Sequence, residues 1–463
     1  MNHLRVPRTP VLVPVIVVAL SSALLFGCSQ DSKSGAKNDK AQAAPSSQFG
    51  GDAGLIVKDL PGGRVGTIEQ DSEGRLVIAS VNSNSIHVQR RLEDGSPDAE
   101  FGKDGTASYE PDSDDWGSFA EGAVVQDDGS VTAVSAIDGD EVYRFVVARF
   151  TADGILDSSF DSDGVVEHDV DSNQWAQDIV ADGDRTIIVR TDNSLIVVES
   201  DGSVSDVQLQ LPAGLAVTDA GMIDGEFMVA MRTVSTLAAP DTRSLSIARI
   251  DPDTGIPDPT FGDEGTATVA SPCKISGQLT LGSVDDSILA AGECDSGVVV
   301  ARLTEDGKAD STFGTKGVAT GDVPALGGRD EYGELHWGPL AIGEDPSGRI
   351  LVATGGTAGR TKLGRVGVEA FTPDGQIARD FGAEGSRLLF ARDQHVTTSV
   401  SHMSTGDVQE EHGEQSSADD ALIDQEGRIL VVGRLERQYD KGDPFLLRIT
   451  ATEPAQDSAP AKP

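Results

Sequence analysis

Basic residues are scarce in this sequence. It contains 36 Lys and Arg residues against 76 Asp and Glu residues, which gives a formal net charge of −40 at pH 7. A surface with this excess of negative charge repels nucleic-acid phosphates and anionic lipid headgroups. We therefore expect no nucleic-acid partner, and cations, basic proteins or neutral glycans remain as partners. The acids are scattered through turns, where their main effect is to keep the protein soluble.

The sequence also lacks the short motifs of common enzyme classes. It has no nucleophile-elbow, zincin or phosphate-loop motif and no dinucleotide-binding fingerprint. Seven His residues are too few to line a channel with metal ligands, so we expect no metal site and no cofactor. His395, His402 and His412 lie together in an acidic segment, and a solvated loop explains them better than a transition-metal site. Calcium stays open, because residues 112–115 and 161–164 offer carboxylates without EF-hand spacing.

Helical periodicity is absent, and a repeat takes its place. The repeat is clearest at residues 298–317, VVVARLTEDGKADSTFGTKG, where an apolar run is followed by an Asp-Gly turn and a Phe-Gly pair. The other copies are at residues 90–105, 148–164, 248–265 and 369–385. Self-similarity at a regular period predicts a repeat architecture, either an array or a ring.

Each repeat contains four short strand candidates. In one unit they are residues 165–170, 177–181, 185–190 and 194–199, which are rich in β-branched residues and bounded by turn residues. The third strand recurs as RLVIAS, SVTAVS, RTIIVR, EFMVAM, SILAAG, RILVAT and RILVVG, and the fourth also recurs seven times. We predict an all-β fold, a seven-bladed β-propeller of four-stranded antiparallel meanders. A β-solenoid is the alternative.

This pattern resembles the bacterial delta-sixty repeat family of propeller-like surface proteins. The resemblance covers most of residues 49–450 and is carried by the five copies quoted above. It implies a propeller architecture and a location in the cell envelope. It implies no particular chemistry.

The recurring residues have structural explanations. Gly95, Gly154, Gly255, Gly307 and Gly375 stand where a tight turn needs positive φ. We expect the Asp residues three positions later to accept backbone N–H groups of the turn (Asp98, Asp157, Asp258 and Asp310, replaced by Ala378 in the sixth copy). The recurring Phe residues should plug between blades. The unit at residues 195–211 lacks the Phe-Gly turn and is the most degenerate.

The two ends of the chain complement each other. No Phe-Gly turn follows the last strand candidate, residues 445–450, but Phe49 and Gly50 supply one before the first. This is the pattern of a circularly cut repeat. We predict that Phe49 docks beside the C-terminal blade and closes the ring.

The N-terminal sequence has the features of a lipoprotein signal peptide. Arg5 and Arg8 precede an apolar run that ends in Leu-Phe-Gly-Cys, with Cys28 last. This order is typical of a secretion signal, and it predicts cleavage before Cys28 and lipid attachment to its sulfur. We divide the chain into a signal peptide (1–27), an acylated flexible tether (28–46), the propeller (47–451) and a tail (452–463). The protein would then be lipid-anchored on the extracytoplasmic side of a bacterial membrane.

The two remaining cysteines predict a disulfide. Cys273 and Cys294 flank a hairpin whose turn lies near residues 285–286, and they are almost equally far from it. They should therefore face each other across two strands in an oxidising compartment.

We expect the loops on one face of the predicted propeller to vary in length and sequence. Loops from first to second and from third to fourth strands leave on one side, and these loops differ in length and chemistry at residues 111–118, 171–175, 321–337 and 393–419. Variable loops on a rigid scaffold are the usual place for binding. All three tryptophans, Trp116, Trp175 and Trp337, fall here, beside Asp114, Asp115, Asp171, Asn173, Glu334 and His336. They predict an aromatic platform for a ligand, and the alternative is that each indole caps its own blade.

Two functions follow from these observations. The first is a binding scaffold of the cell envelope that holds a protein or glycan ligand on the variable face. The second is an extracytoplasmic glycan hydrolase or lyase that uses a carboxylate pair at the central channel. The enzyme would need two facing acids, at least one with a strongly raised pKa.

Overall fold

The computed structural model places thirty β-strands and leaves some connections undescribed. It describes residues 54–56, 60, 64–82, 85–110, 118–138, 143–170, 175–234, 243–294, 297–321, 336–357, 364–382, 386–392, 395–398, 414–437 and 443–449 of the 463. Within these ranges no helix has the length and hydropathy needed to cross a membrane.

The strands form seven antiparallel sheets, each with four main strands. The innermost strands are β2 (Arg64–Gln70), β6 (Ser118–Val125), β10 (Ala176–Asp182), β14 (Leu215–Ile223), β19 (Ile275–Val284), β23 (His336–Glu344) and β28 (Glu414–Ile423). The second strands are β3 (Leu76–Asn82), β7 (Val131–Asp138), β11 (Arg185–Arg190), β15 (Glu226–Thr233), β20 (Ser287–Cys294), β24 (Ile350–Thr357) and β29 (Ile429–Arg437).

The outer half of each sheet follows the same order. The third strands are β4 (Ser85–Arg91), β8 (Tyr143–Phe150), β12 (Ser194–Val198), β16 (Ser244–Asp251), β21 (Gly297–Leu303), β25 (Gly364–Phe371) and β30 (Asp443–Ile449). The outermost are β5 (Thr106–Tyr109), β9 (Val165–Val170), β13 (Val204–Gln208), β18 (Thr266–Ala270), β22 (Val318–Thr320), β26 (Ser386–Arg392) and β1 (Gly54–Ile56). Two short strands, β17 (Ile256–Pro257) and β27 (His395–Thr398), extend the fourth and sixth sheets.

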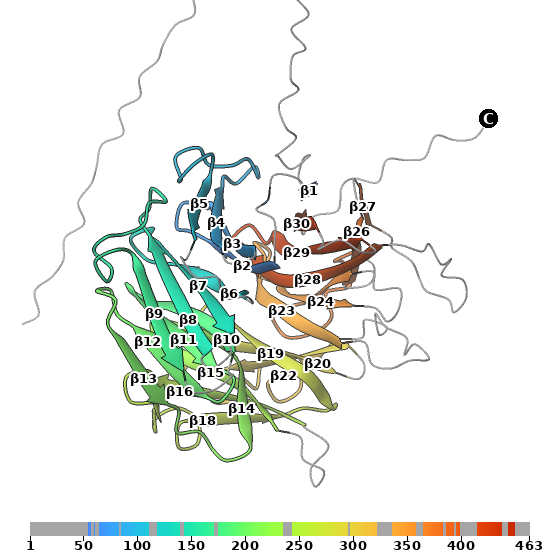
Figure 1. The fold of residues 1–463 in the computed structure, drawn as a ribbon. Helices are drawn as coiled ribbons and strands as arrows, with labels where there is room; N and C mark the ends of the chain where they lie inside the picture. Colours follow the sequence, from blue (N-terminus) through green and yellow to red (C-terminus); the bar gives the residue numbers. More distant parts are fainter. Residues whose placement is uncertain are drawn as a thin grey trace, which may run out of the picture. The chain divides into compact units, whose positions relative to one another are not determined.

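The sheets form a ring. Each innermost strand contacts the innermost strands of both neighbouring sheets, from β2 through β6, β10, β14, β19 and β23 to β28 and back to β2. Figure 1 shows the sheets arranged around these strands. The fold is therefore the predicted seven-bladed β-propeller, and we number the blades one to seven from β2 to β28.

The grouping of strands into blades differs from the sequence-based units. Residues 165–170 were expected to start a unit, but β9 pairs with β8 and closes the second blade. The third blade starts with β10. The repeat hides this boundary because the Phe-Gly segment lies within a blade, between its third and outermost strands. The faces expected for the loops do not change.

The N-terminal strand closes the ring. β1 pairs antiparallel with β30, with Leu55 opposite Leu447, and so supplies the outermost strand of the last blade. Figure 1 shows β1 beside β30. The ends of the chain are thus joined in one sheet, as the circularly cut repeat predicts. Phe49 lies outside the described residues, and its docking stays a prediction.

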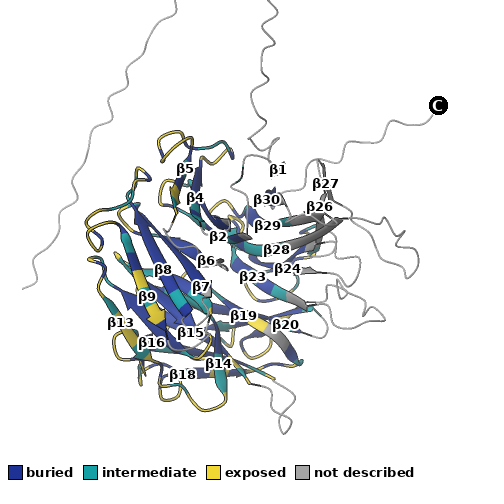
Figure 2. Cartoon of the chain, in the orientation of Figure 1, coloured by how far each residue is buried: buried dark blue, intermediate teal, exposed yellow. Residues whose placement is uncertain are grey.

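The core lies between neighbouring blades. Short β-branched and Ala side chains of the middle strands pack across each junction, and large buried Phe rings fill the wider outer part. Figure 2 shows β8 and β15 largely buried, whereas β13 has exposed positions. Burial of one Phe side chain contributes about 1.5–3 kcal/mol, so the plugs are a main source of cohesion between blades.

The plug is a module of three side chains. Phe101 is fully buried beside strands of the first and second blades. Arg90 stacks 4.6 Å from its ring centroid and forms an ion pair of 2.7 Å with Asp98. Asp98 also accepts the N–H of Glu100, as expected from the sequence. The same arrangement recurs in the second, fourth and fifth blades through Asp157, Asp258 and Asp310.

Close backbone approach explains one of the recurring glycines. Gly154 has φ of 75° and faces the plug of the preceding blade. A Cβ atom added there would lie 2.6 Å from the backbone nitrogen of Gly102. Any other residue would push the plug out of the junction, so this position requires Gly for packing as well as for its turn.

The sixth blade replaces both charged residues of the plug module. Ala378 replaces the Asp, and Ala370 replaces the Arg that would have paired with it. The backbone bond from the Ala378 N–H to the Ala370 carbonyl is kept at 2.9 Å. Arg349, from the start of the second-strand region, stacks on Phe381 instead. The loss of both charges together avoids a buried, unpaired ion.

The structure tests two further predictions, the disulfide and the segment at residues 393–419. Cys273 and Cys294 form a disulfide with Cα atoms 5.8 Å apart in the fifth blade. Closing this loop contributes about 3 kcal/mol on the chain-entropy model. Residues 393–419 were expected to form one long variable loop, and that expectation is wrong for residues 395–398 and 414–419; residues 393–394 and 399–413 lie outside the described residues. The segment includes β27 and the first half of β28, an innermost strand, which the weak apolar pattern of EQSSADDALI concealed.

Candidate functional site

The two faces of the ring are built differently. On one face lie the turns between first and second strands and the plug segments. In the first blade, Asp71 accepts the N–H groups of Glu73 and Arg75 and forms an ion pair of 2.6 Å with the Arg75 side chain. Asp345 with Arg349 and Asp424 with Arg428 repeat this turn. These three acids are therefore structural, and we call this face the turn face.

The opposite face, which we call the loop face, carries the variable connections. Trp175 lies there, directly before β10, and 41% of its surface is exposed. Its ring meets Tyr143 edge-on at 5.9 Å, and its carbonyl accepts the N–H of Thr191. An exposed indole fixed by an aromatic neighbour offers rigid contact area with a polar N–H.

The structure places only some of the expected site residues. Trp337 and His336 lie in β23, opposite Gly356 and Thr357, and not in a loop. Their strand continues the inner ring further toward the loop face than the sequence indicates. His395 likewise belongs to β27. Outside the described residues lie Trp116, Asp114, Asp115, Asp171, Asn173, Glu334, His402, His412 and Cys28.

The innermost strands share a feature that sequence reasoning missed. Every innermost strand has a register shift at the same level, for example between Ala176 and Asp178 and between Ala418 and Asp420. A bulge re-aims the side chain that follows it. The residues that follow are Thr67, Gly122, Asp178, Asp219, Leu279, Ala341 and Asp420.

The polar members of this set join one blade to the next. Asp178 accepts the N–H of Ala220 at 2.7 Å, and Asp219 accepts the N–H of Leu281 at 2.6 Å. Asp420 accepts the N–H of Ile68 at 2.9 Å, which links the last blade to the first. Thr67 bonds both the N–H and the carbonyl of Ala123. These side chains satisfy backbone groups that no sheet partner reaches.

The same acids have raised pKa values. Burial raises the pKa of Asp420 to about 7 and that of Asp178 to about 6. Burial, and then the charge of Asp178, raise the pKa of Asp219 well above its usual range. Burial and the charges of Asp420 and Asp178 raise the pKa of Glu69 to about 8. Their side chains keep partial solvent contact, but the surrounding strands remove most of their hydration.

Asp178 and Asp219 form a carboxyl pair. They lie close enough that the charge of Asp178 raises the pKa of Asp219. Such a pair is the arrangement that acid–base chemistry uses. Here, however, an oxygen of each carboxyl is already engaged by a backbone N–H of the next blade. The pair therefore holds blades three, four and five together, whatever else it does.

Metal ligation has little support in the described part of the chain. No group of three or more His, Cys, Asp or Glu side chains there could hold a metal ion. In the cluster at residues 161–164, Asp163 accepts the N–H of Val165 and so stabilises a turn.

A signal for the channel acids is present in the sequence but weak. Asp178, Asp219 and Asp420 each stand three or four residues before the end of an innermost strand, directly before a short apolar stretch. An acid in a strand that faces a ring axis is costly unless it is hydrogen-bonded. Without the blade boundaries, this position could not be told apart from the many acids in turns.

The comparisons with known proteins support the architecture. A family model described as "Domain of unknown function (DUF5122) beta-propeller" matches residues 126–160, which span β7, β8 and Phe160. No curated protein matches the chain.

Solved structures of similar fold share little sequence with the chain. "Streptogramin B lyase structure" is 12% identical over 85% of this chain and 96% of that chain, with a TM-score of 0.42. A virginiamycin B lyase from Staphylococcus aureus is 13% identical over 85% and 99%, with a TM-score of 0.40. "YCF48 bound to D1 peptide" is 11% identical over 89% and 97%, with a TM-score of 0.41.

Proposed function

We propose that this protein is a binding scaffold that holds a protein or glycan ligand on the loop face of its propeller. The difference between the two faces carries the proposal. The turn-face acids Asp71, Asp345 and Asp424 are engaged with Arg side chains and turn N–H groups. The loop face instead exposes Trp175, which no turn or plug requires. Rigid aromatics on a scaffold are typical centres of recognition.

The scaffold would be displayed in the cell envelope. The lipobox ending at Cys28, the resemblance to delta-sixty repeat proteins and the Cys273–Cys294 disulfide support this location. Metabolic labelling with a radioactive fatty acid tests it. The wild-type chain should carry label and partition into detergent, and Cys28→Ser should do neither. Equal labelling of both would contradict lipid attachment at Cys28.

Binding to the loop face is tested with immobilised envelope glycans and basic proteins. The wild-type protein should be retained by one of these classes. Trp175→Ala should weaken retention by about tenfold, which is the range for loss of an aromatic anchor. Asp127→Ala, at an exposed position of the turn face, is the matched control and should bind normally. Equal loss in both variants would contradict a site on the loop face.

One observation favours a second candidate, a glycan hydrolase or lyase. The Asp178–Asp219 pair and the raised pKa of Glu69 provide groups that can hold a proton at neutral pH. Glu69→Gln tests this candidate, because Glu69 does not supply one of the inter-blade carboxylate bonds. Loss of glycan cleavage with retained folding would support an enzyme, and absence of cleavage by the wild type across envelope glycans would reject it.

A further inference from the structure

Both ends of the propeller chain meet the ring on the turn face. The turn from β28 to β29 lies on that face, so β29 runs toward the loop face and β30 runs back to the turn face. β1 is antiparallel to β30, and Gly54 pairs with Arg448 near the end of β30. Ile56 pairs further back, with Leu446. The chain therefore enters β1 from the turn face and leaves β30 on the same face.

A contact with the first blade fixes the position of this end of β30. The Arg448 guanidinium donates to the Glu93 carbonyl at 2.8 Å. Glu93 lies in the tight turn that follows β4, where the Gly95 N–H bonds the Leu92 carbonyl, and this turn belongs to the turn face. The Glu93 side chain also pairs with Arg428, beside the turn from β28 to β29. The loop face thus carries neither end of the propeller chain.

The segment between Cys28 and β1 is short compared with the depth of the ring. Residues 29–53 form this segment, and a chain of that length that behaves as a flexible coil spans about 25–30 Å on average. An innermost strand of nine residues, such as β14, is about 30 Å long. A lipid on Cys28 would hold the turn face within one such span of the membrane. The loop face would reach the membrane only if the segment ran past the whole ring.

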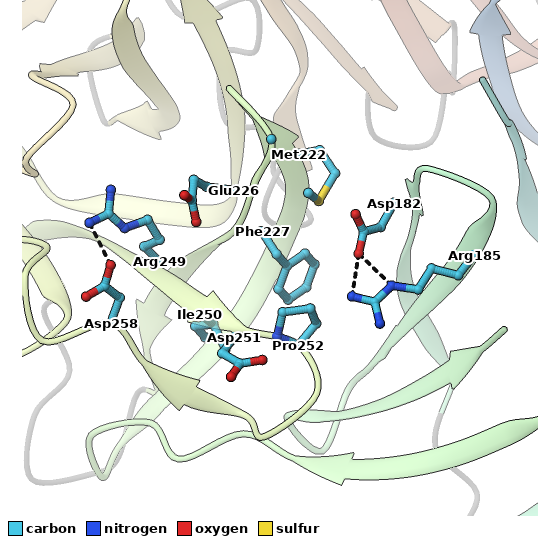
Figure 3. Close-up of a pocket in the computed structure, with 11 residues that line it drawn as sticks. Asp182, Arg185, Met222, Glu226, Phe227, Arg249, Ile250, Asp251, Pro252 and Asp258 are labelled. Atoms are coloured by element: carbon cyan, nitrogen blue, oxygen red, sulfur yellow. Dashed lines mark hydrogen bonds and ion pairs between the residues drawn. The ribbon is translucent and has the colours of Figure 1, made fainter. Parts of the chain in front are cut away.

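The charge of the turn face opposes adhesion to lipid. Figure 3 shows this face at the third and fourth blades, where Arg185 forms an ion pair with Asp182. The exposed acids Glu226 and Asp251 line the same hollow. Anionic headgroups repel such a surface. We therefore expect the turn face to stay at the distance that the tether allows and not to lie flat on the membrane.

We propose that the anchored propeller points its turn face toward the membrane and its loop face, with Trp175, toward the space beyond. The inference rests on the proposed lipid attachment at Cys28 and deepens the proposed function, because it identifies where the ligand comes from. The ligand of the loop face is supplied from outside the membrane. Neither a lipid nor a protein held within the bilayer reaches this face.

Energy transfer from two positions to the membrane tests this orientation. A fluorophore is attached at Asp127, in the turn from β6 to β7, or at Ala213, between β13 and β14 on the loop face; both positions are exposed. A clickable unnatural amino acid carries it, so that all cysteines stay unchanged. The lipidated full-length chain is reconstituted in vesicles that contain an acceptor-labelled lipid. Transfer from position 127 should exceed transfer from position 213 by about threefold, because the two faces lie about 30 Å apart.

Two control variants separate the possible failures. Cys28→Ser should lose transfer from both positions, and if it does not, the proposal falls together with the proposed anchor. A Gly/Ser insert after residue 46 that doubles the tether should reduce the difference between the positions, because a longer coil lets the ring turn over. Equal transfer from the two positions in the anchored chain, greater transfer from position 213, or a difference that the insert leaves unchanged would overturn the proposal without affecting the retention test of Trp175→Ala.

Discussion

Arg90 and Asp98 show how single residues hold this ring. Their ion pair is almost fully buried, with side-chain exposures of 3% and 7%. The Arg90 guanidinium also donates to the Ala152 carbonyl of the second blade at 2.7 Å. Asp98→Ala should therefore destabilise the protein by about 3–5 kcal/mol, because it leaves a buried charge without its partner. Arg90→Ala/Asp98→Ala should cost less than the sum of the single changes, as the Ala370 and Ala378 pair of the sixth blade indicates.

Urea unfolding of the four proteins in this cycle measures the coupling. The exposed pair Asp306 and Lys308 is the matched control, and its cycle should give less than about 1 kcal/mol. Strictly additive effects at Arg90 and Asp98 would contradict the account of the plug as one module.

The raised pKa of Glu69 predicts that the protein loses stability as the pH rises. Its pKa rises from 4.5 to about 8 in the folded protein, so folding favours the protonated form. Its contribution is complete below about pH 4.5 and is lost as the pH rises toward 8. The turn acids act in the opposite sense. Burial alone would raise the pKa of Asp98, but the Glu100 N–H and the Arg90 guanidinium lower it, so its contribution is lost only in acid.

Melting temperatures from pH 4 to 8.5 separate these effects. Glu69→Gln imitates the protonated carboxyl, so it should melt with the wild type near pH 4 and several degrees above it at pH 8.5. A constant difference across the range would show that Glu69 does not titrate between folded and unfolded states.

At the scale of elements, β1 closes the ring by pairing with β30. It covers the edge of β30, with Gly54, Leu55 and Ile56 opposite Arg448, Leu447 and Leu446. A chain that begins at residue 58 lacks this strand and exposes the unpaired edge of β30. It should melt several degrees lower and aggregate, whereas a chain that begins at residue 47 should match the wild type in a thermal scan. Equal melting of the two chains would contradict closure by β1.

The strands were predictable from the sequence, but their grouping was not. The repeated second and third strands, such as RTIIVR and FVVARF, are buried on both faces and therefore read as continuous apolar runs. The innermost strands carry bulges and acids, which break the period of two. Residues 414–419 of β28 read as an insert for this reason, and Trp337 read as a loop residue because its strand begins with Gly and Pro neighbours.

For the whole molecule, the repeat determined the architecture and left the site open. Seven copies of two strand motifs fix the number of blades, because each blade needs one of each. The bonds of the Asp178, Asp219 and Asp420 carboxylates depend on contacts between blades, and no local pattern encodes those contacts.

Tryptophan fluorescence of the full chain, titrated with envelope glycan fragments, basic proteins and calcium, tests the central claim most directly. Trp175 is partly exposed on the loop face, so a ligand that covers it should shift its emission to the blue. We predict a saturable shift with one ligand class and its loss in Trp175→Phe, while Asp127→Lys on the turn face keeps it. An unchanged spectrum with every ligand class, together with Trp175 emission already that of a buried indole, would contradict a binding site on this face.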